Sequence, residues 1–371
     1  MKNIKEKIYD FVIVGAGFAG LSSAYHLAKD GHSVLVIDRN DGHNNASSNS
    51  TAMLSHDPDA HWDMVISQFG IENARKVWKL SEQALTLLEA YTKESSPHVN
   101  VTRVPAHIFA RSKAKSGALY EQHEMYRKIG MKTEFTREGG TMHKSFHSVL
   151  TIPQEAQTNN WMLLNSLARS VRKHGGKIIL NLPVTSVSEE RGLARISAGK
   201  EMFYAKQAII ASGNQNFFPN LTRDIKVKRT FALSFEKHGM QKLFSSSIMW
   251  DNEKPYHYIR SFKGNTIWVG GEDVMEKNYD PKKDYYPPLE EFAREVLGFD
   301  KSYKRVSAWS AVFFPTQSGL PIIAKLPDMP IYMNVGFGGT GILMSFISGY
   351  LLASWMKKKE MAYKPLFDIK K

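Results

Sequence analysis

The chain has 371 residues, a formal net charge of +13 and no cysteine. The absence of cysteine excludes disulfides, thiolate metal sites, a cysteine nucleophile and a cysteine-linked cofactor, and it fits a reducing, cytoplasmic compartment. Lysine and arginine are spread along the chain rather than clustered, which disfavours nucleic acid as a partner. The apolar stretch Ile342 to Met356 has about 15 residues, fewer than the roughly 20 that a membrane span needs. We therefore expect a soluble protein of two domains without a signal peptide.

The first motif combines a strand, a glycine-rich turn and a helix. Phe11 to Val14 is a short apolar run typical of a buried parallel strand, and Gly15, Gly17 and Gly20 follow with G-x-G-x-x-G spacing. The first glycine permits a tight turn, the second lets a pyrophosphate approach the backbone, and the third lets the helix pack closely on the strand. A second strand ends on Asp38, whose carboxylate can accept hydrogen bonds from an adenosine ribose and would repel a 2′-phosphate. The motif predicts dinucleotide binding but does not distinguish FAD from NAD.

A long polar segment without helix or strand periodicity follows Asp38. Loops of this length in a compact domain are usually functional or disordered. The hydroxyl residues between Ser47 and Thr51, followed by Ala52, Met53 and Leu54, suit a backbone that lies against a flat ligand. A plain solvent-exposed loop is the alternative interpretation.

The rest of the chain alternates between two patterns. Helical periodicity over residues 71–91 is followed by mixed strand and loop over residues 99–150, and then by a second helix-to-strand unit from Trp161 to Leu180. Residues 221–310 alternate apolar and polar side chains, as antiparallel strands with one wet face do. We expect an α/β fold in which a Rossmann-like FAD/NAD(P)-binding βαβ domain is interrupted by an α+β substrate domain with an antiparallel sheet. The nucleotide-binding domain takes residues 1–90, 151–220 and 305–371, and the substrate domain takes residues 91–150 and 221–304.

A second glycine-rich turn, "NVGFGGTGI" from Asn334, leads into an apolar helix near the C-terminus. One dinucleotide needs only one phosphate-binding turn of this kind. The second turn therefore requires an explanation of its own.

Several motifs that occur in order along nearly the whole chain resemble the FAD-dependent D-amino acid oxidase, glycine oxidase and sarcosine oxidase superfamily. They are "VIVGAGFAGLSSAYHLAKDGHSVLVIDR", "NASSNSTAML", "VTSV", "IIASGNQ", "YIRSFKGNTIWVGGED" and "WSAVFFPTQSGLPIIAKLPDMPIYMNVGFGGTGI". The resemblance implies that the first glycine turn holds the ADP half of FAD and that the second lies beneath the isoalloxazine ring. Amides and a helix N-terminus at that ring would stabilise the negative charge of reduced flavin near N1 and C2=O.

The resemblance assigns FAD contacts to four groups of residues. The ADP half takes Gly15, Gly17, Phe18, Ala19, Gly20, Asp38 and Arg39; the pyrophosphate–flavin side takes Ser47, Ser48, Asn49, Thr51, Ala52, Met53 and Leu54; the middle nucleotide contacts are Val184, through its backbone to adenine, with Ala211, Ser212 and Gly213; and the ring takes Gly338, Gly339, Thr340, Gly341 and Ile342.

Three departures from the family limit the functional prediction. In glycine and D-amino acid oxidases an Arg soon after the signature Trp clamps the substrate carboxylate, whereas the position that follows Trp309 here holds Phe313. Relatives similar to sarcosine oxidase use a Lys above the flavin to activate oxygen, and the matching place holds Trp268. Relatives with covalent FAD use a Cys or a His, and Ser50 stands where that His would be. We expect non-covalent FAD, with nearby His56 as the remaining candidate for a tether.

The catalytic residues do not follow from the resemblance, but Tyr256, Tyr258 and Arg260 are candidates because period-2 spacing places them on one face of a strand. On that interpretation Arg260 serves a carboxylate and the tyrosines surround an amine; the alternative is three ordinary sheet residues with a solvated Arg. Trp309 and Phe313 are expected in the core.

The predicted function is oxidation of a C–N bond in a small amine, amino acid or N-substituted amino acid. Hydride passes to flavin N5, the imine product hydrolyses, and O2 or an unknown acceptor takes the electrons. No metal is expected. Two alternatives remain open: a scaffold or assembly factor whose FAD is mainly structural, and an FAD enzyme acting on a modified tRNA nucleoside.

Overall fold

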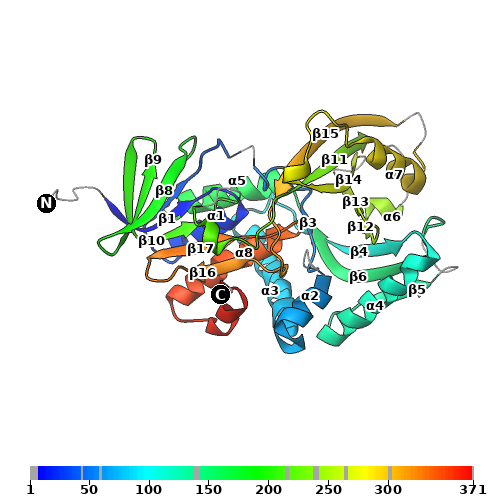
Figure 1. Ribbon diagram of the computed structural model, residues 1–371, viewed down its shortest axis with the longest axis horizontal. Coiled ribbons are helices and arrows are strands. Elements are labelled where there is room, and N and C mark those ends of the chain that lie inside the picture. The colour runs from blue at the N-terminus through cyan, green and yellow to red at the C-terminus, as the bar shows by residue number, and fades with distance from the viewer. Residues whose placement is uncertain are drawn as a thin grey trace.

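Two sheets lie at opposite ends of the long axis of the molecule, as the computed structural model in Figure 1 shows. The structure describes residues 7–42, 45–57, 61–137, 143–213, 217–236, 242–262, 266–299 and 303–369. The ends of two sequence motifs, residues 214–215 of "IIASGNQ" and 263–265 of the "YIRSFKGNT" segment, lie outside these ranges.

Sheet A contains the nucleotide-binding pattern predicted from the sequence. Its described strands run in the order β16-β17-β10-β1-β2-β7, with β8 and β9 extending from β10. The four adjoining strands β17, β10, β1 and β2 pair in parallel, as does β7 with β2. The strands are β1 (Ile8–Val14), β2 (Val34–Ile37), β7 (Lys177–Ile179), β8 (Val184–Glu190), β9 (Leu193–Ala198), β10 (Glu201–Ile210), β16 (Ile322–Lys325) and β17 (Ile331–Val335).

Both faces of the parallel strands are covered, which explains their continuous apolar sequence. Phe11 and Ile13 of β1 pack into a core formed with the helices, while Val12 and Val14 pack on the opposite side against the β8–β9 hairpin. The helices of the first side are α1 (Phe18–Lys29), α3 (Ile71–Ser95), α5 (Asn160–Lys173) and α8 (Gly341–Met356), with α2 (His61–Phe69) beside α3.

The closest helix contact joins the two glycine-turn helices, α1 and α8. A Cβ placed on Gly349 of α8 would lie 2.5 Å from the backbone carbon of Ser22 and 2.6 Å from the amide nitrogen of Ser23. The hydroxyl of Ser22 donates to the carbonyl oxygen of Phe346 over 2.7 Å. The absence of a side chain at position 349 therefore lets the two helices pack backbone to backbone.

Sheet B contains the antiparallel sheet that alternation predicted, and among its described pairings only that of β12 with β4 is parallel. Its described strands run in the order β15-β11-β14-β13-β12-β4-β6-β3, with β5 paired to β6. A second apolar core separates it from α7 (Pro287–Leu297). The strands are β3 (Met53–Leu54), β4 (Thr102–Ala110), β5 (Glu134–Arg137), β6 (Ser148–Gln157), β11 (Lys228–Glu236), β12 (Ile248–Asp251), β13 (His257–Phe262), β14 (Thr266–Met275) and β15 (Lys304–Phe313); short helices are α6 (Lys242–Ser245) and the 3₁₀ turns Pro219–Leu221, Glu276–Asn278 and Met361–Leu366.

Three features differ from the sequence expectation. Residues 99–150 include a helix, α4 (Lys113–Ile129), which buries Leu119 and Tyr126 and ends at Gly130 with a φ of 97°. The expected domain boundaries at 151 and 305 fall inside β6 and β15, which both belong to sheet B because their pairing continues across those positions. The segment after Asp38 contributes β3 to the edge of sheet B, so it joins the two sheets. Among the described residues, no helix is long and apolar enough to cross a bilayer.

Candidate active site

A cavity of about 1130 Å³ is lined by both glycine turns and by strands of sheet B. The first turn contributes Gly15 and Gly17, and the second contributes residues 336–342. Both α1 and α8 therefore begin at the wall of the same cavity. This arrangement answers the question raised by the two motifs, because one ligand can contact both helix N-termini.

The first turn has the geometry that the glycine spacing predicts. Gly15 has a φ of 110°, and a Cβ there would lie 2.8 Å from the carbonyl carbon of Ala211 at the end of β10. A Cβ on Gly20 would lie 2.9 Å from the carbonyl carbon of Gly15 and would collide with its oxygen. The third glycine thus permits the close approach of α1 to β1, and the N-terminus of α1 is left open to the cavity.

Asp38 is buried in the cavity wall beside the first turn. Its Oδ2 accepts from the amide of Ala16 over 2.6 Å, and its Oδ1 accepts from the amide of Asn40 over 2.8 Å. A carboxylate has about four acceptor positions, so these two bonds fix its orientation and leave capacity for a ribose hydroxyl. Arg39 and Val184 also line the cavity.

The segment between Asn45 and Leu54 crosses the cavity, and its last four residues alternate between facing the cavity and being buried behind it. Thr51 and Met53 line the cavity, whereas Ala52 and Leu54 are fully buried behind it. Ala52 has a φ of 53°, a left-handed conformation that turns the backbone at this point. Elements on both sides hold the segment: the Asn160 side chain donates to the Ser48 carbonyl over 2.6 Å, and the Trp309 indole donates to the Asn49 carbonyl over 3.1 Å.

The second turn lies against both the first helix and sheet B. The amide of Gly338 donates to the carbonyl of Phe314 over 3.1 Å. The side-chain nitrogen of Asn334 donates to the Ser23 hydroxyl over 3.0 Å, which connects the start of the turn to α1. The side-chain oxygen of Asn334 is buried and has no hydrogen-bond partner within the described part of the chain. An orphaned acceptor in the cavity wall fits a site that is completed by a polar ligand.

Most of the residues assigned to FAD by resemblance line this one cavity. Four do not: Gly20, Ser48, Ala52 and Leu54 lie behind the lining and support it. The lining residues are Gly15, Gly17, Phe18, Ala19, Asp38, Arg39, Ser47, Asn49, Thr51, Met53, Val184, Ala211, Ser212, Gly213, Gly338, Gly339, Thr340, Gly341 and Ile342.

Two of the three catalytic candidates face the cavity. Tyr256 and Tyr258 both line it, and the ring of Tyr258 lies flat over Gly270 of the neighbouring strand, where a Cβ would be 2.7 Å from the Tyr258 Cε2. Burial and the nearby charge of Asp273 raise the pKa of Tyr258, while hydrogen bonds with the Thr230 and Thr51 hydroxyls oppose that shift. The Tyr258 hydroxyl is therefore protonated at neutral pH.

Arg260 does not line the cavity, so the structure does not support its expected role toward a substrate carboxylate. It is buried, and its guanidinium donates to the carbonyl of Thr51, to the carbonyl of Thr158 over 2.6 Å and to the side chain of Gln157 over 3.1 Å. Burial lowers its pKa to about 9. These contacts fix the Thr51 backbone to sheet B, so Arg260 supports the cavity wall from behind.

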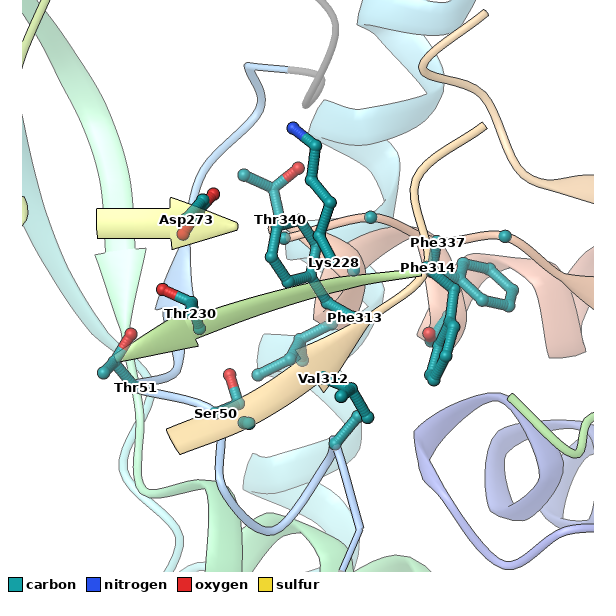
Figure 2. Close-up of a pocket in the computed structure, with 18 of the residues that line it drawn as sticks. Ser50, Thr51, Lys228, Thr230, Asp273, Val312, Phe313, Phe314, Phe337 and Thr340 are labelled. Atoms are coloured by element: carbon teal, nitrogen blue, oxygen red, sulfur yellow. The ribbon is translucent and has the colours of Figure 1, made fainter. Parts of the chain in front are cut away.

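Two of the three positions that depart from the family lie in different places. Trp268 pairs with Arg260 across β13 and β14 and stacks on Phe262, away from the cavity lining. Phe313 does line the cavity, although it is largely buried, whereas Trp309 supports Asn49 from behind. Figure 2 shows Phe313 and its neighbour Phe314 beside the labelled cavity residues.

The cavity residues that the sequence interpretation missed include a polar group on β11 and β14, namely Lys228, Thr230 and Asp273. They project from β11 and β14, as Figure 2 shows. The sequence holds one signal for them, because "KVKRT" and "GGED" place charged residues inside strands that are otherwise apolar. Their common face depends on strand pairing, which the sequence does not reveal.

A bulge-like irregularity within β14, at "GGED", determines which side of the strand each acidic residue faces. Gly271 and Glu272 have φ values of 139° and 56°, and the register between β11 and β14 shifts here. Glu272 faces away from the cavity and contacts His257 Nε2 over 3.0 Å, while Asp251 contacts His257 Nδ1 over 2.9 Å. Burial opposes the charged form of His257, but the hydrogen bonds and charges of Asp251 and Glu272 outweigh it and raise its pKa.

Together, the doubly covered parallel sheet, the two helix N-termini at one cavity and the adjoining antiparallel sheet define a dinucleotide-binding flavoprotein fold. The chain belongs to the DAO family of FAD-dependent oxidoreductases, whose family model matches residues 10–355. It is therefore an FAD-binding oxidoreductase, as the motifs predicted.

Individual relatives agree with this assignment. The glycine oxidase of Bacillus licheniformis is 25% identical over 369 residues, which cover 94% of this chain and 92% of that protein. The gamma-glutamylputrescine oxidoreductase of Escherichia coli is 22% identical, with coverage of 94% and 83%. The crystal structure of glycine oxidase from Geobacillus kaustophilus superposes with a TM-score of 0.85 at 19% identity and covers 99% of each chain. The expected α/β fold with an antiparallel second sheet is thus confirmed.

Proposed function

We propose that the protein oxidises a C–N bond of a small amine, amino acid or N-substituted amino acid and releases an imine that hydrolyses. The observation that carries the proposal is the continuity of the cavity, which extends from the two glycine turns to Tyr256, Tyr258 and the polar residues of β11 and β14. A substrate bound there would lie next to the ring end of FAD. When bound, FAD supplies the acceptor for the hydride that leaves the substrate α-carbon.

The second glycine turn favours the charge that develops during this reaction. The amides around Gly338 to Gly341 and the N-terminus of α8 place partial positive charge at the cavity wall. Fixed dipoles of this kind stabilise a developing anion without reorganisation. We propose that these amides and the N-terminus of α8 face the pyrimidine edge of the flavin.

The part of the cavity wall at the end of β15 is apolar. Val312, Phe313, Phe314 and Phe337 line the cavity on this side, as Figure 2 shows. An apolar wall excludes water and favours the neutral form of an amine. A neutral amine has the lone pair that forms the second C–N bond as hydride leaves, and water then attacks the resulting imine to release a carbonyl compound and an amine.

Anaerobic mixing of the holoprotein with a panel of primary amines, secondary amines and amino acids tests the proposal. We expect at least one of them to bleach the visible absorption band of the flavin. If none does, while dithionite reduces the same flavin normally, the FAD is structural and the proposal is wrong. Acid precipitation of the same preparation should leave all the flavin in the supernatant, because we expect no covalent bond from His56 or another residue.

A further inference from the structure

We propose that Lys228 binds the carboxylate of the substrate, so that the preferred substrates are amino acids or N-substituted amino acids rather than simple amines. This inference rests on the proposed function and narrows it. Lys228 would do from β11 what the family's Arg does from the position of Phe313.

Of the other cations in or directly behind this part of the cavity wall, Arg229 and Arg260 are bonded to protein partners, Lys115 pairs with Glu253, and Lys254 is exposed rather than half-buried. Arg229 forms a bidentate salt bridge, in which its guanidinium donates to both carboxylate oxygens of Glu276 over 2.8 and 2.6 Å. It also donates to the Ser310 hydroxyl over 2.9 Å. Arg260 is buried behind the lining with its donors on backbone carbonyls. The charge of Arg229 is already paired with Glu276, and the guanidinium of Arg260 lies behind the lining.

Lys228 differs from both arginines. It is half-buried in the cavity wall, and in the part of the chain that the structure describes its ammonium makes no ion pair and no side-chain hydrogen bond. Its contact is the ring of Phe313, whose centroid lies 5.9 Å from Nζ. A partly desolvated ammonium without a carboxylate partner is an incomplete site, and an anionic ligand group would complete it.

The position of Lys228 relates directly to the residue that the family pattern lacks. Lys228 and Phe313 are paired across β11 and β15. Directly opposed residues on antiparallel strands have Cβ atoms about 4.5–5.5 Å apart, which is less than the length of a lysine side chain. Relative to the family's Arg, the positive charge therefore lies on the neighbouring strand, and it still faces the cavity.

Asp273 gives the cavity an opposite charge near Lys228. Met275 pairs with Lys228 across the two strands, and Asp273 lies two residues from Met275, on the same face. Thr230 shares that face, two residues from Lys228, and all three polar residues surround the cavity in Figure 2. A pocket with a cation and an anion on one face matches a ligand that carries a carboxylate and an amine.

Lysine and arginine bind carboxylates differently. An ammonium acts as a point charge, whereas a guanidinium fixes a carboxylate through two parallel hydrogen bonds. We therefore expect the protein to accept amino acids with different substituents on nitrogen or the α-carbon more readily than a site with a bidentate Arg would.

The test compares matched ligands on the holoprotein and on the variants Lys228→Met, Lys228→Arg and Lys226→Met. Lys226 is exposed, lies two residues before Lys228 and does not line the cavity, so it controls for the loss of one charge. The ligand pairs are sarcosine with dimethylamine and proline, in both enantiomers, with pyrrolidine. Anaerobic stopped-flow flavin reduction gives a dissociation constant and a limiting rate for each pair.

We expect Lys228→Met to weaken amino acid binding by about tenfold to a hundredfold, as for loss of one hydrogen bond to a charged group. Lys228→Arg should recover most of the affinity, Lys226→Met should change nothing, and dimethylamine and pyrrolidine should be unaffected. Equal effects on the amino acid and its amine counterpart would overturn the proposal. So would unchanged binding with slower reoxidation by O2, since Lys228 would then act on oxygen.

A second measurement does not require turnover. Acetate and benzoate should perturb the visible flavin spectrum of the wild type and of Lys226→Met, with a dissociation constant about tenfold weaker or more in Lys228→Met. If no substrate reduces the wild-type flavin but these carboxylates bind through Lys228, the proposed function fails and the carboxylate site stands. If carboxylates bind equally to wild type and Lys228→Met, the site is wrong.

Discussion

The contact between α1 and α8 makes a specific prediction about cofactor binding. In a Gly349→Ala variant the new methyl group would lie 2.5 Å from the Ser22 backbone carbon and 2.6 Å from the Ser23 nitrogen. Nonbonded carbon contacts are optimal at about 3.5–4.0 Å, so the two helices must separate by roughly 1 Å. Overpacking of this kind costs about 1–3 kcal/mol.

The strain falls on the two helices that carry the glycine turns, so we expect it to weaken FAD binding as well as folding. A loss of about 1.4 kcal/mol corresponds to tenfold in a dissociation constant, and we expect FAD affinity to fall by about tenfold. Titration of apoprotein with FAD, followed by quenching of flavin fluorescence, measures this affinity. Urea unfolding of the apoprotein measures the loss of stability separately.

Gly117→Ala provides a matched control at an exposed position of α4. A Cβ on Gly117 of α4 meets nothing within 4 Å, and its φ lies outside the left-handed region. Alanine should stabilise that helix by about 0.5–1 kcal/mol without altering FAD affinity. If Gly349→Ala has the same urea unfolding midpoint and the same FAD dissociation constant as the wild type, this contact does not hold the two turns together and the reasoning is refuted.

Three further predictions concern other residues. Asp38→Ala should weaken FAD binding by about tenfold or more, because Ala16 and Asn40 lose their acceptor and a ribose hydroxyl loses its own; unchanged affinity in an FAD titration would contradict this. Arg260→Met should lower the free energy of unfolding by about 1–3 kcal/mol, since it leaves the carbonyls of Thr51 and Thr158 without their donor, and a urea midpoint equal to that of the wild type would argue against it. The raised pKa of His257 between Asp251 and Glu272 contributes stability that is complete below its unfolded pKa of about 6.5 and is lost as pH rises through the folded value. Denaturant unfolding across that range should show a decline in the wild type that His257→Gln lacks, and parallel curves would refute the assignment.

The nucleotide half of the site was predictable because its determinants are local. Gly15, Gly20 and Asp38 belong to one βαβ unit, and each keeps in the structure the geometry that its spacing implies. The second turn was recognisable for the same reason. What the sequence did not show is the contact that joins them, since Gly349 and Ser22 are brought together by tertiary packing alone.

The substrate half was harder to predict because it depends on strand pairing. Alternation correctly placed Tyr256 and Tyr258 on one face, but it gives no information on depth, so it did not show that Thr51 and Thr158 cover Arg260. The side of β14 that Asp273 faces depends on the bulge-like irregularity at Gly271 and Glu272, after which the alternation of side chains between the two faces is shifted by one residue. A sequence pattern identifies a face of a strand, and the register of its neighbours decides what that face contacts.

The hydrogen bond from Ser22 to Phe346 spans 324 positions of the chain. During synthesis the first glycine turn leaves the ribosome long before α8 is made, so the early part of the chain contains only one of the two turns that line the cavity. On the proposed assignment of the second turn to the flavin ring, the complete set of FAD contacts then forms only after α8 has been made.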